Sequence, residues 1–156
     1  MAIDIGIPEK NRTEIATELS RFLADTFTLY FMTHTFHWNV TGPQFHTLHD
    51  MFMQQYEEMW TATDEIAERI RSLGAMAPAN QAAFRELTSV SEPDAIPSAQ
   101  AMLQAALAGH EQVIRQGRKI VGMAAAVSDE ATADLVTQRV QTHEKTAWML
   151  RAMLSE

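Results

Sequence analysis

The first long helix of this chain must end within residues 34–49, which read HTFHWNVTGPQFHTLH. Glycine and proline are sparse in the sequence, and here Gly42 and Pro43 stand side by side. Glycine is common at helix ends, and proline suits the first position of a new helix. The stretch therefore predicts a tight turn between two long helices, over residues 13–39 and 43–73.

Apolar residues also recur at helical spacing in the last third of the chain. They predict two further long helices, over residues 98–126 and 129–154. Residues 75–97 hold three of the five prolines and predict a long connection with a short helix over 82–87. We therefore expect one all-α domain over residues 1–156, whose two short turns and one long crossover are typical of a ferritin-like four-helix bundle.

Capping residues predict where two of these helices begin. Asn11 stands before the first helix with Glu14 three residues on, which is the capping-box spacing. Residues 1–12 are therefore expected to form an N-terminal tail. Ser128 stands before the last helix and Asp129 in its first turn, where an acid stabilises the positive helix end.

Composition excludes several classes of protein. The chain has 156 residues, no cysteine and a formal charge of −8, so disulfides and thiolate metal sites are absent. The excess of acidic over basic residues argues against a protein that binds nucleic acid over its whole surface. No stretch of about 18 apolar residues predicts a membrane span. The first residues lack the basic and apolar regions of a secretion signal, so we expect a cytoplasmic protein, with nucleoid association left open.

The residues that suggest chemistry flank the turn. Four of the six histidines are His34, His37, His46 and His49. The first two lie near the end of one helix and the last two near the start of the next. Each pair has i,i+3 spacing, which puts both members on one helical face.

Two carboxylates follow on the second helix. Asp64 and Glu68 have i,i+4 spacing and share a face. Imidazole and carboxylate ligands without sulfur suit iron, manganese or zinc. The alternative is that the two acids form a solvated face with Arg69 and Arg71, and the residues alone leave both interpretations open.

Helix length decides how these groups could share a metal. His49 and Asp64 are 15 positions apart, which is about 22 Å along a helix. One ion cannot touch both on the same chain. They can meet only if two copies of this helix pack antiparallel about a two-fold axis, so a shared metal requires a dimer or larger.

A metal centre inside one bundle is not expected. Di-iron centres of that kind use Glu-x-x-His pairs. No glutamate stands three positions before any of the six histidines; those positions hold Phe31, His34, Pro43, His46, Leu107 and Val140. The two remaining histidines, His110 and His143, are isolated in the sequence and are expected to be structural.

Three stretches resemble the Dps family, the ferritin-like mini-cages. They are residues 35–49, residues 64–74 (DEIAERIRSLG) and residues 143–150 (HEKTAWML). The resemblance covers essentially the whole chain. It implies a hollow dodecamer with ferroxidase sites between two-fold-related subunits.

The resemblance also implies a ligand set and a reaction. The metal ligands are His37 and His49 from one chain, with Asp64 and Glu68 from the other. Iron is the implied metal, although the same donors suit zinc or manganese. Such a protein oxidises Fe²⁺, preferably with hydrogen peroxide and otherwise with oxygen, and stores a ferric mineral, which protects against oxidative damage.

One position departs from the family pattern. The family usually places another acid four residues after His49, and here that residue is Met53. A thioether is a poor ligand for Fe²⁺, so the iron position near His49 is expected to be weak. The stronger position is expected to persist on its three ligands, Asp64, Glu68 and His37.

Three neighbouring residues have more than one interpretation. His34 or His46 could reach the weak position through water or shift the preferred metal. Trp38, next to His37, could trap stray oxidising equivalents, or it could pack at a subunit interface. The residues alone do not choose between these roles.

Two acids at the start of the last helix also have two interpretations. Glu130 and Asp134 match the place where the family lines a three-fold pore, and there they would draw cations inward. Alternatively, they compensate the helix dipole at a solvated end.

Strong DNA binding is not expected. At the C-terminal end, the positive charge of Arg151 is offset by the negative charge of Glu156. Twelve copies of a chain of charge −8 together carry a charge of −96, which repels the phosphates of DNA. The charged residues of the first twelve positions sum to zero: Asp4, Glu9, Lys10 and Arg12. The sequence leaves two alternatives to an iron-oxidising cage. One is a DNA-condensing protein, and the other is an inert cage that holds zinc or manganese.

Overall fold

Four long helices and one short helix make up the computed structural model, which describes residues 3–155. The elements are α1 (Glu9–Asn39), α2 (Phe45–Ser72), α3 (Gln81–Leu87), α4 (Ala99–Ala125) and α5 (Glu130–Leu154). Strands are absent from the described part of the chain. The all-α prediction, the turn after Asn39 and the short helix in the crossover are therefore confirmed.

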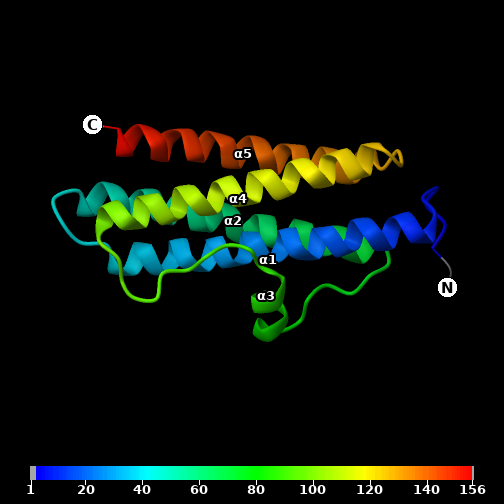
Figure 1. Ribbon diagram of the computed structural model, residues 1–156, viewed down its shortest axis with the longest axis horizontal. Helices are drawn as coiled ribbons and strands as arrows, with labels where there is room; N and C mark the ends of the chain where they lie inside the picture. The colour runs from blue at the N-terminus through cyan, green and yellow to red at the C-terminus, as the bar shows by residue number, and fades with distance from the viewer. Residues whose placement is uncertain (1–2, 156) are drawn as a thin grey trace.

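The long helices form a bundle of two antiparallel pairs. Helix α1 packs chiefly on α2, and α4 packs chiefly on α5. Figure 1 shows that α2 and α4 run in the same direction, so the crossover between them returns along the length of the bundle. Within that crossover, α3 packs against α1. The connectivity is that of a four-helix bundle with one long crossover.

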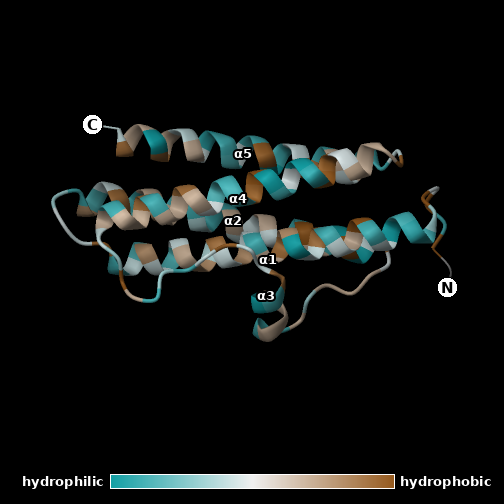
Figure 2. Cartoon of the chain, viewed as in Figure 1, coloured by the Kyte–Doolittle hydropathy of each residue, from teal (hydrophilic) through white to brown (hydrophobic). Residues whose placement is uncertain are grey.

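A continuous apolar core holds the pairs together. Apolar and polar residues are interspersed along each long helix (Figure 2). Burying one large apolar side chain contributes about 1.5–3 kcal/mol to the stability of the fold. The largest fully buried side chains are Phe22, Phe52, Ile15, Leu19, Leu29, Met32, Leu48, Met59, Ile66, Ile70, Leu73 and Met102. Among residues 3–155, no helix is both long and apolar enough to cross a bilayer.

Helix α1 begins four residues earlier than predicted. Its first residue is Glu9, Pro8 is its N-cap, and Asn11 lies inside the helix rather than capping it. Arg12, the fourth residue of the helix, stabilises this start, because its side chain donates to the carbonyls of Ile7 at 3.1 Å and Leu73 at 3.2 Å. The expected twelve-residue tail is therefore wrong in its end point.

The cap of α5 is also different from the prediction. Ser128 has a φ of 58° and does not cap the helix. Asp129 is the N-cap, and its buried carboxylate accepts from the backbone N–H of Thr132 at 3.0 Å and from Arg69 at 2.7 Å. Because Arg69 belongs to α2, this contact ties the start of α5 to the end of α2.

A buried aspartate fixes the path of the crossover. Asp25 of α1 is 1% exposed. Its carboxylate accepts from the Thr88 hydroxyl at 3.0 Å and from the backbone N–H of Ser89 at 2.6 Å. Charge-assisted bonds of this kind are strong, so they hold the segment after α3 against the bundle.

Candidate metal centre

Two histidines meet where α1 ends and α2 begins. The rings of His37 and His49 are stacked with centroids 3.7 Å apart. Nδ1 of His37 lies 2.7 Å from the carbonyl oxygen of His49, and Nδ1 of His49 lies 2.8 Å from the carbonyl oxygen of His37. The two residues thus approach each other across the turn.

These bonds determine the tautomer of both rings. A carbonyl oxygen only accepts, so each Nδ1 must carry the proton and donate. In the neutral imidazole, Nε2 then keeps its lone pair. A backbone carbonyl on the remote ring nitrogen is the usual support for a metal-binding histidine. The pair therefore presents two oriented Nε2 donors.

The turn itself explains why the rings meet. Gly42 has a φ of 113°, a conformation that favours glycine. The backbone N–H of Phe45 donates to the Gly42 carbonyl at 3.0 Å. Val40 and Leu48 are buried on either side of the turn. Apolar anchors and a tight turn thus bring the last turn of α1 beside the first turn of α2.

The predicted carboxylates stand apart from the histidine pair. Asp64 and Glu68 are exposed on α2, toward the opposite end of that helix. Within residues 3–155 of one chain, no three His, Asp or Glu side chains are placed to hold a metal ion together. The structure of one chain does not test a site between two chains, so the ligand set remains a prediction.

His34 belongs to a different cluster. Its ring stacks on Tyr56 at 3.8 Å, and its Nδ1 lies 3.3 Å from the Tyr30 hydroxyl. Trp38 is 4.5 Å away, between centroids. Burial, and to a smaller extent His37, lowers the pKa of His34 below its usual value. The neutral ring is thus part of an aromatic group beside the histidine pair.

His46 points elsewhere. It is exposed, and its Nδ1 lies 3.7 Å from an Asp50 carboxylate oxygen, one helical turn away. It therefore does not join the stacked pair within the chain. The suggested contribution of His46 to the weak metal position remains a prediction.

The candidate pore acids are exposed at the start of α5. Glu130 is the first helical residue, and Asp134 accepts from the Gln138 side chain at 2.7 Å. The bond between Asp129 and Arg69 holds this helix start in place. Both interpretations, pore lining and compensation of the helix dipole, remain predictions.

The sequence missed a buried histidine pair. His110 and His143 are 33 residues apart, yet their Nδ1 atoms are 2.8 Å apart. Arg139 donates to Nε2 of His143 at 3.2 Å, so His143 must donate from Nδ1 to His110. Burial lowers the pKa of His110 to about 3 and that of His143 well below its usual value. Both rings are neutral, and Glu58 binds the arginine beside them.

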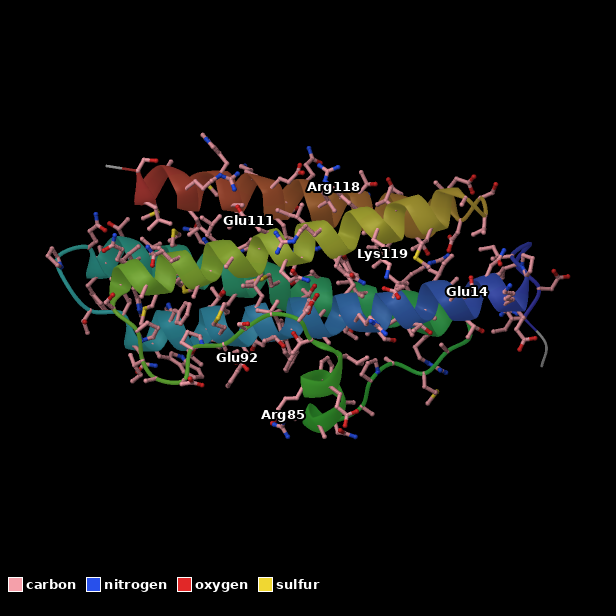
Figure 3. All side chains as sticks on the ribbon, viewed as in Figure 1. Glu14, Arg85, Glu92, Glu111, Arg118 and Lys119 are labelled. Carbon is pink, nitrogen blue, oxygen red and sulfur yellow. The ribbon has the colours of Figure 1, made fainter. Side chains whose placement is uncertain are left out.

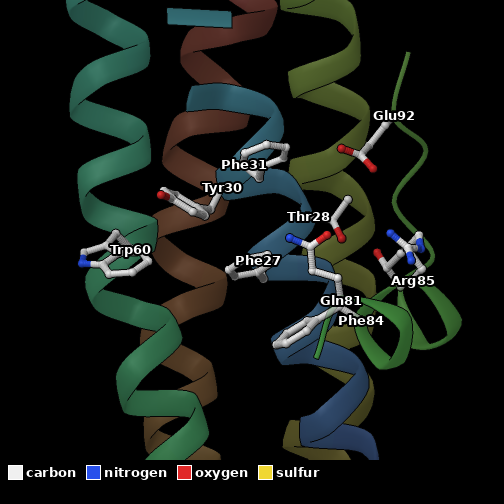
Figure 4. Close-up of a pocket in the computed structure, with 10 residues that line it drawn as sticks. Phe27, Thr28, Tyr30, Phe31, Trp60, Gln81, Phe84, Arg85 and Glu92 are labelled. Atoms are coloured by element: carbon white, nitrogen blue, oxygen red, sulfur yellow. The ribbon is translucent and has the colours of Figure 1, made fainter. Parts of the chain in front are cut away.

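The aromatic cluster was also missed, although the sequence held a signal. Tyr30, His34 and Trp38 stand at four-residue intervals, as do Tyr56 and Trp60. The Tyr30 and Trp60 rings are 5.3 Å apart, between α1 and α2. Figure 4 shows both beside a pocket of about 380 Å³. This spacing on two adjacent helices could have predicted a shared aromatic face.

Comparisons with known proteins agree on one family. A model described as a ferritin-like domain matches residues 16–156. The chain is 36% identical to DNA protection during starvation protein 2 of Bacillus anthracis, over 92% of this chain and 98% of that one. A crystal structure of a Dps protein from Bacillus brevis shares 34% identity over 94% and 98% of the two chains, with a TM-score of 0.90.

A second solved structure matches the fold more closely. The Dps protein from Vibrio cholerae has a TM-score of 0.94 and 28% identity, over 99% of this chain and 98% of that one. It is described as a member of a broad superfamily of ferritin-like diiron-carboxylate proteins.

Proposed function

This chain belongs to the Dps family of ferritin-like proteins, and on that premise we propose that it oxidises Fe²⁺ at sites between subunits and stores the ferric product. Hydrogen peroxide is the preferred oxidant in this proposal, and oxygen the second. The assembly is a hollow dodecamer. Its purpose is protection against oxidative damage in the cytoplasm, with nucleoid association left open.

The observation that carries the proposal is the paired support of His37 and His49. Each ring has its Nδ1 proton committed to a backbone carbonyl, at 2.7 and 2.8 Å. Both Nε2 lone pairs are consequently available for a cation. Asp64 and Glu68 of a second copy would supply the carboxylate oxygens that Fe²⁺ favours beside imidazole.

The chemistry follows from electron counting. Two Fe²⁺ ions give two electrons to one hydrogen peroxide, and with two protons the products are two Fe³⁺ and two water molecules. A single Fe²⁺ gives only one electron and releases a hydroxyl radical. Holding two ions at one site therefore removes iron and peroxide without that radical.

Mutation of the carboxylates tests the proposal. Asp64→Ala and Glu68→Ala are expected to abolish the fast Fe³⁺ absorbance that follows mixing with Fe²⁺ and peroxide. The matched control is Glu65→Ala, an exposed acid on the same helix. Light scattering checks that each variant still assembles, at 210 kDa for twelve chains of 17.5 kDa. Wild-type rates in both variants would refute the ligand set.

The same experiment separates the inert cage from the oxidising one. If the wild-type protein forms Fe³⁺ no faster than a protein-free control, a cage that only holds zinc or manganese is favoured. Trp38, exposed and next to His37, remains either a trap for oxidising equivalents or an interface residue.

DNA condensation is not part of the proposal. The chain is acidic, and several of its basic side chains are already paired with carboxylates. Lys119 of α4 binds Glu18 of α1 at 2.9 Å, and Arg118 of α4 binds Glu144 of α5; Figure 3 labels both basic residues. We expect no stable complex in a gel shift at about 150 mM salt, because binding through phosphates weakens steeply with salt.

A further inference from the structure

The proposed iron ligand His49 has no oxygen donor one turn away on its own helix. Phe45, one turn before it, stacks on its ring with centroids 5.1 Å apart. Met53, one turn after it, carries a thioether. Asp50 is next in sequence and so lies on another face of α2, where its carboxylate is 3.7 Å from Nδ1 of His46. Of the residues on its own helix, only Met53 is therefore placed to share a cation with His49.

Contacts on both sides place Met53 beside the histidine pair. His49 precedes it by four residues and stacks on His37 at 3.7 Å. Tyr56 follows it by three residues on the same face of α2, and the Tyr56 ring lies 5.3 Å from that of His37. Met53 is half-buried between these two residues. Its long, flexible side chain therefore lies along the face of α2 that carries the proposed iron ligand.

Oxidation changes the donor atom that this side chain offers. A thioether sulfur is a soft donor and binds Fe²⁺ poorly. In methionine sulfoxide the same side chain carries a polar S=O group. Its oxygen bears a partial negative charge, and Fe²⁺ accepts oxygen donors beside imidazole. The oxidised side chain can thus serve as a ligand where the reduced one cannot.

We propose that hydrogen peroxide converts Met53 to its sulfoxide and that the sulfoxide oxygen completes the weaker Fe²⁺ position beside His49. This inference rests on the proposed function, because peroxide and Fe²⁺ are the substrates of the same site. A sulfur lone pair attacks one peroxide oxygen, the S–O bond forms and the O–O bond breaks. The proton on the transferred oxygen leaves with the departing hydroxide. The thioether gives up two electrons, peroxide takes both, and the products are methionine sulfoxide and one water molecule.

The site itself directs this oxidation to Met53. Peroxide is consumed by the Fe²⁺ held at the tighter position, so it meets Met53 more often than a methionine elsewhere in the chain. The first molecules of the oxidant thereby turn a site for one tightly bound Fe²⁺ into a site for two.

Peptide mass spectrometry tests the oxidation step. The assembled protein is taken through several turnovers with Fe²⁺ and hydrogen peroxide, stripped of iron with a chelator and digested. The expected result is a gain of one oxygen atom at Met53 ahead of Met51. Met51 is the matched control, because it is also half-buried on α2 but lines a pocket between α2 and α5. In Asp64→Ala, which lacks a ligand of the tighter position, Met53 should lose this lead.

Anaerobic titration with Fe²⁺ tests the ligation step. After the same treatment, the number of Fe²⁺ ions bound per site should rise toward two in the wild type and in Met51→Leu. It should stay unchanged in Met53→Leu, because leucine fills a similar volume but takes up no oxygen. Met53→Gln places a neutral oxygen donor at the same position and should raise the number without any peroxide. Since neither the sulfoxide nor glutamine is charged, such a rise reports ligation rather than added charge.

The outcomes separate this inference from the proposed function. If the wild type forms Fe³⁺ while Met53 keeps its thioether or is oxidised no sooner than Met51, only this inference is overturned. A sulfoxide at Met53 that leaves the number of bound Fe²⁺ ions unchanged overturns it as well. If the wild type forms no Fe³⁺ during the turnovers, the ferroxidase proposal itself fails and the inference fails with it.

Discussion

His37 and His49 each donate a ring Nδ1 proton to the other's backbone carbonyl, at 2.7 and 2.8 Å. The two bonds join the end of α1 to the start of α2 and, in the neutral rings, leave the lone pair on Nε2. The same contact thus closes the turn and prepares two metal ligands.

The two histidines are expected to have unequal effects on iron binding. His37→Ala should lower the Fe²⁺ affinity of the tighter position by at least about tenfold, because it removes one of the three proposed ligands. Loss of a residue that only supports a ligand already costs a metal site about that much affinity. His49→Ala should instead remove only the weaker position. Anaerobic calorimetric titration with Fe²⁺ measures both affinity and stoichiometry. Equal losses in the two variants would contradict the assignment of strong and weak positions.

Met53→Glu is expected to strengthen the second iron position. A carboxylate one turn after His49 replaces a thioether with a ligand that suits Fe²⁺. The number of Fe²⁺ ions bound per site should rise toward two in the same titration. Gln54→Glu adds the same charge at the adjacent exposed position and should leave the stoichiometry unchanged. If both variants bind alike, the effect is general charge rather than ligation.

Acid is expected to destabilise the fold through the buried histidine pair. The pKa of His110 is lowered to about 3 in the folded chain by burial, against about 6.5 in an unfolded one. Between these values the unfolded state binds a proton that the folded state does not. Stability is therefore complete above about pH 6.5 and falls as the pH is lowered toward 3.

Urea unfolding at fixed protein concentration across this pH range measures the effect. His110→Gln keeps an acceptor for the Nδ1 proton of His143 but does not itself titrate, so its stability should depend less steeply on pH. His46→Gln is the control, because His46 is exposed. Parallel profiles for the wild type and His110→Gln would show that His110 is not responsible.

Two glycines of α4 are expected to respond oppositely to alanine. A Cβ at Gly117 would lie 2.6 Å from Cγ2 of Val140 on α5, a stiff side chain. Overpacking of this kind costs about 1–3 kcal/mol. A Cβ at Gly122 meets nothing within 4 Å, so Gly122→Ala should stabilise the helix by up to about 1 kcal/mol. Thermal unfolding compares the two, and a stabilised Gly117→Ala would disprove the close packing of α4 on α5.

Most of the helical architecture was predictable because helices depend on local patterns. Apolar periodicity placed the four long helices, and the Gly42-Pro43 pair placed the turn. The helix starts were less predictable, because several residues in one stretch can cap. Asp129 rather than Ser128 is the N-cap of α5, and its carboxylate also accepts a hydrogen bond from Arg69 of α2.

The ligand set of the candidate site stays a prediction. Spacing along the helices brought out His37, His49, Asp64 and Glu68, and helix length showed that one chain cannot join them. Spacing could not show that the stacked rings would exchange bonds with each other's backbones, because that depends on how α1 and α2 pack.

Local order along the chain was therefore enough to predict the bundle, whereas the composition of the candidate metal site stays a prediction. Only three-dimensional packing decided that His110 lies against His143 and that the Tyr30 hydroxyl reaches His34 beside Tyr56. Side chains from different helices meet according to helix rotation and crossing, and those are set by the whole core rather than by any single stretch.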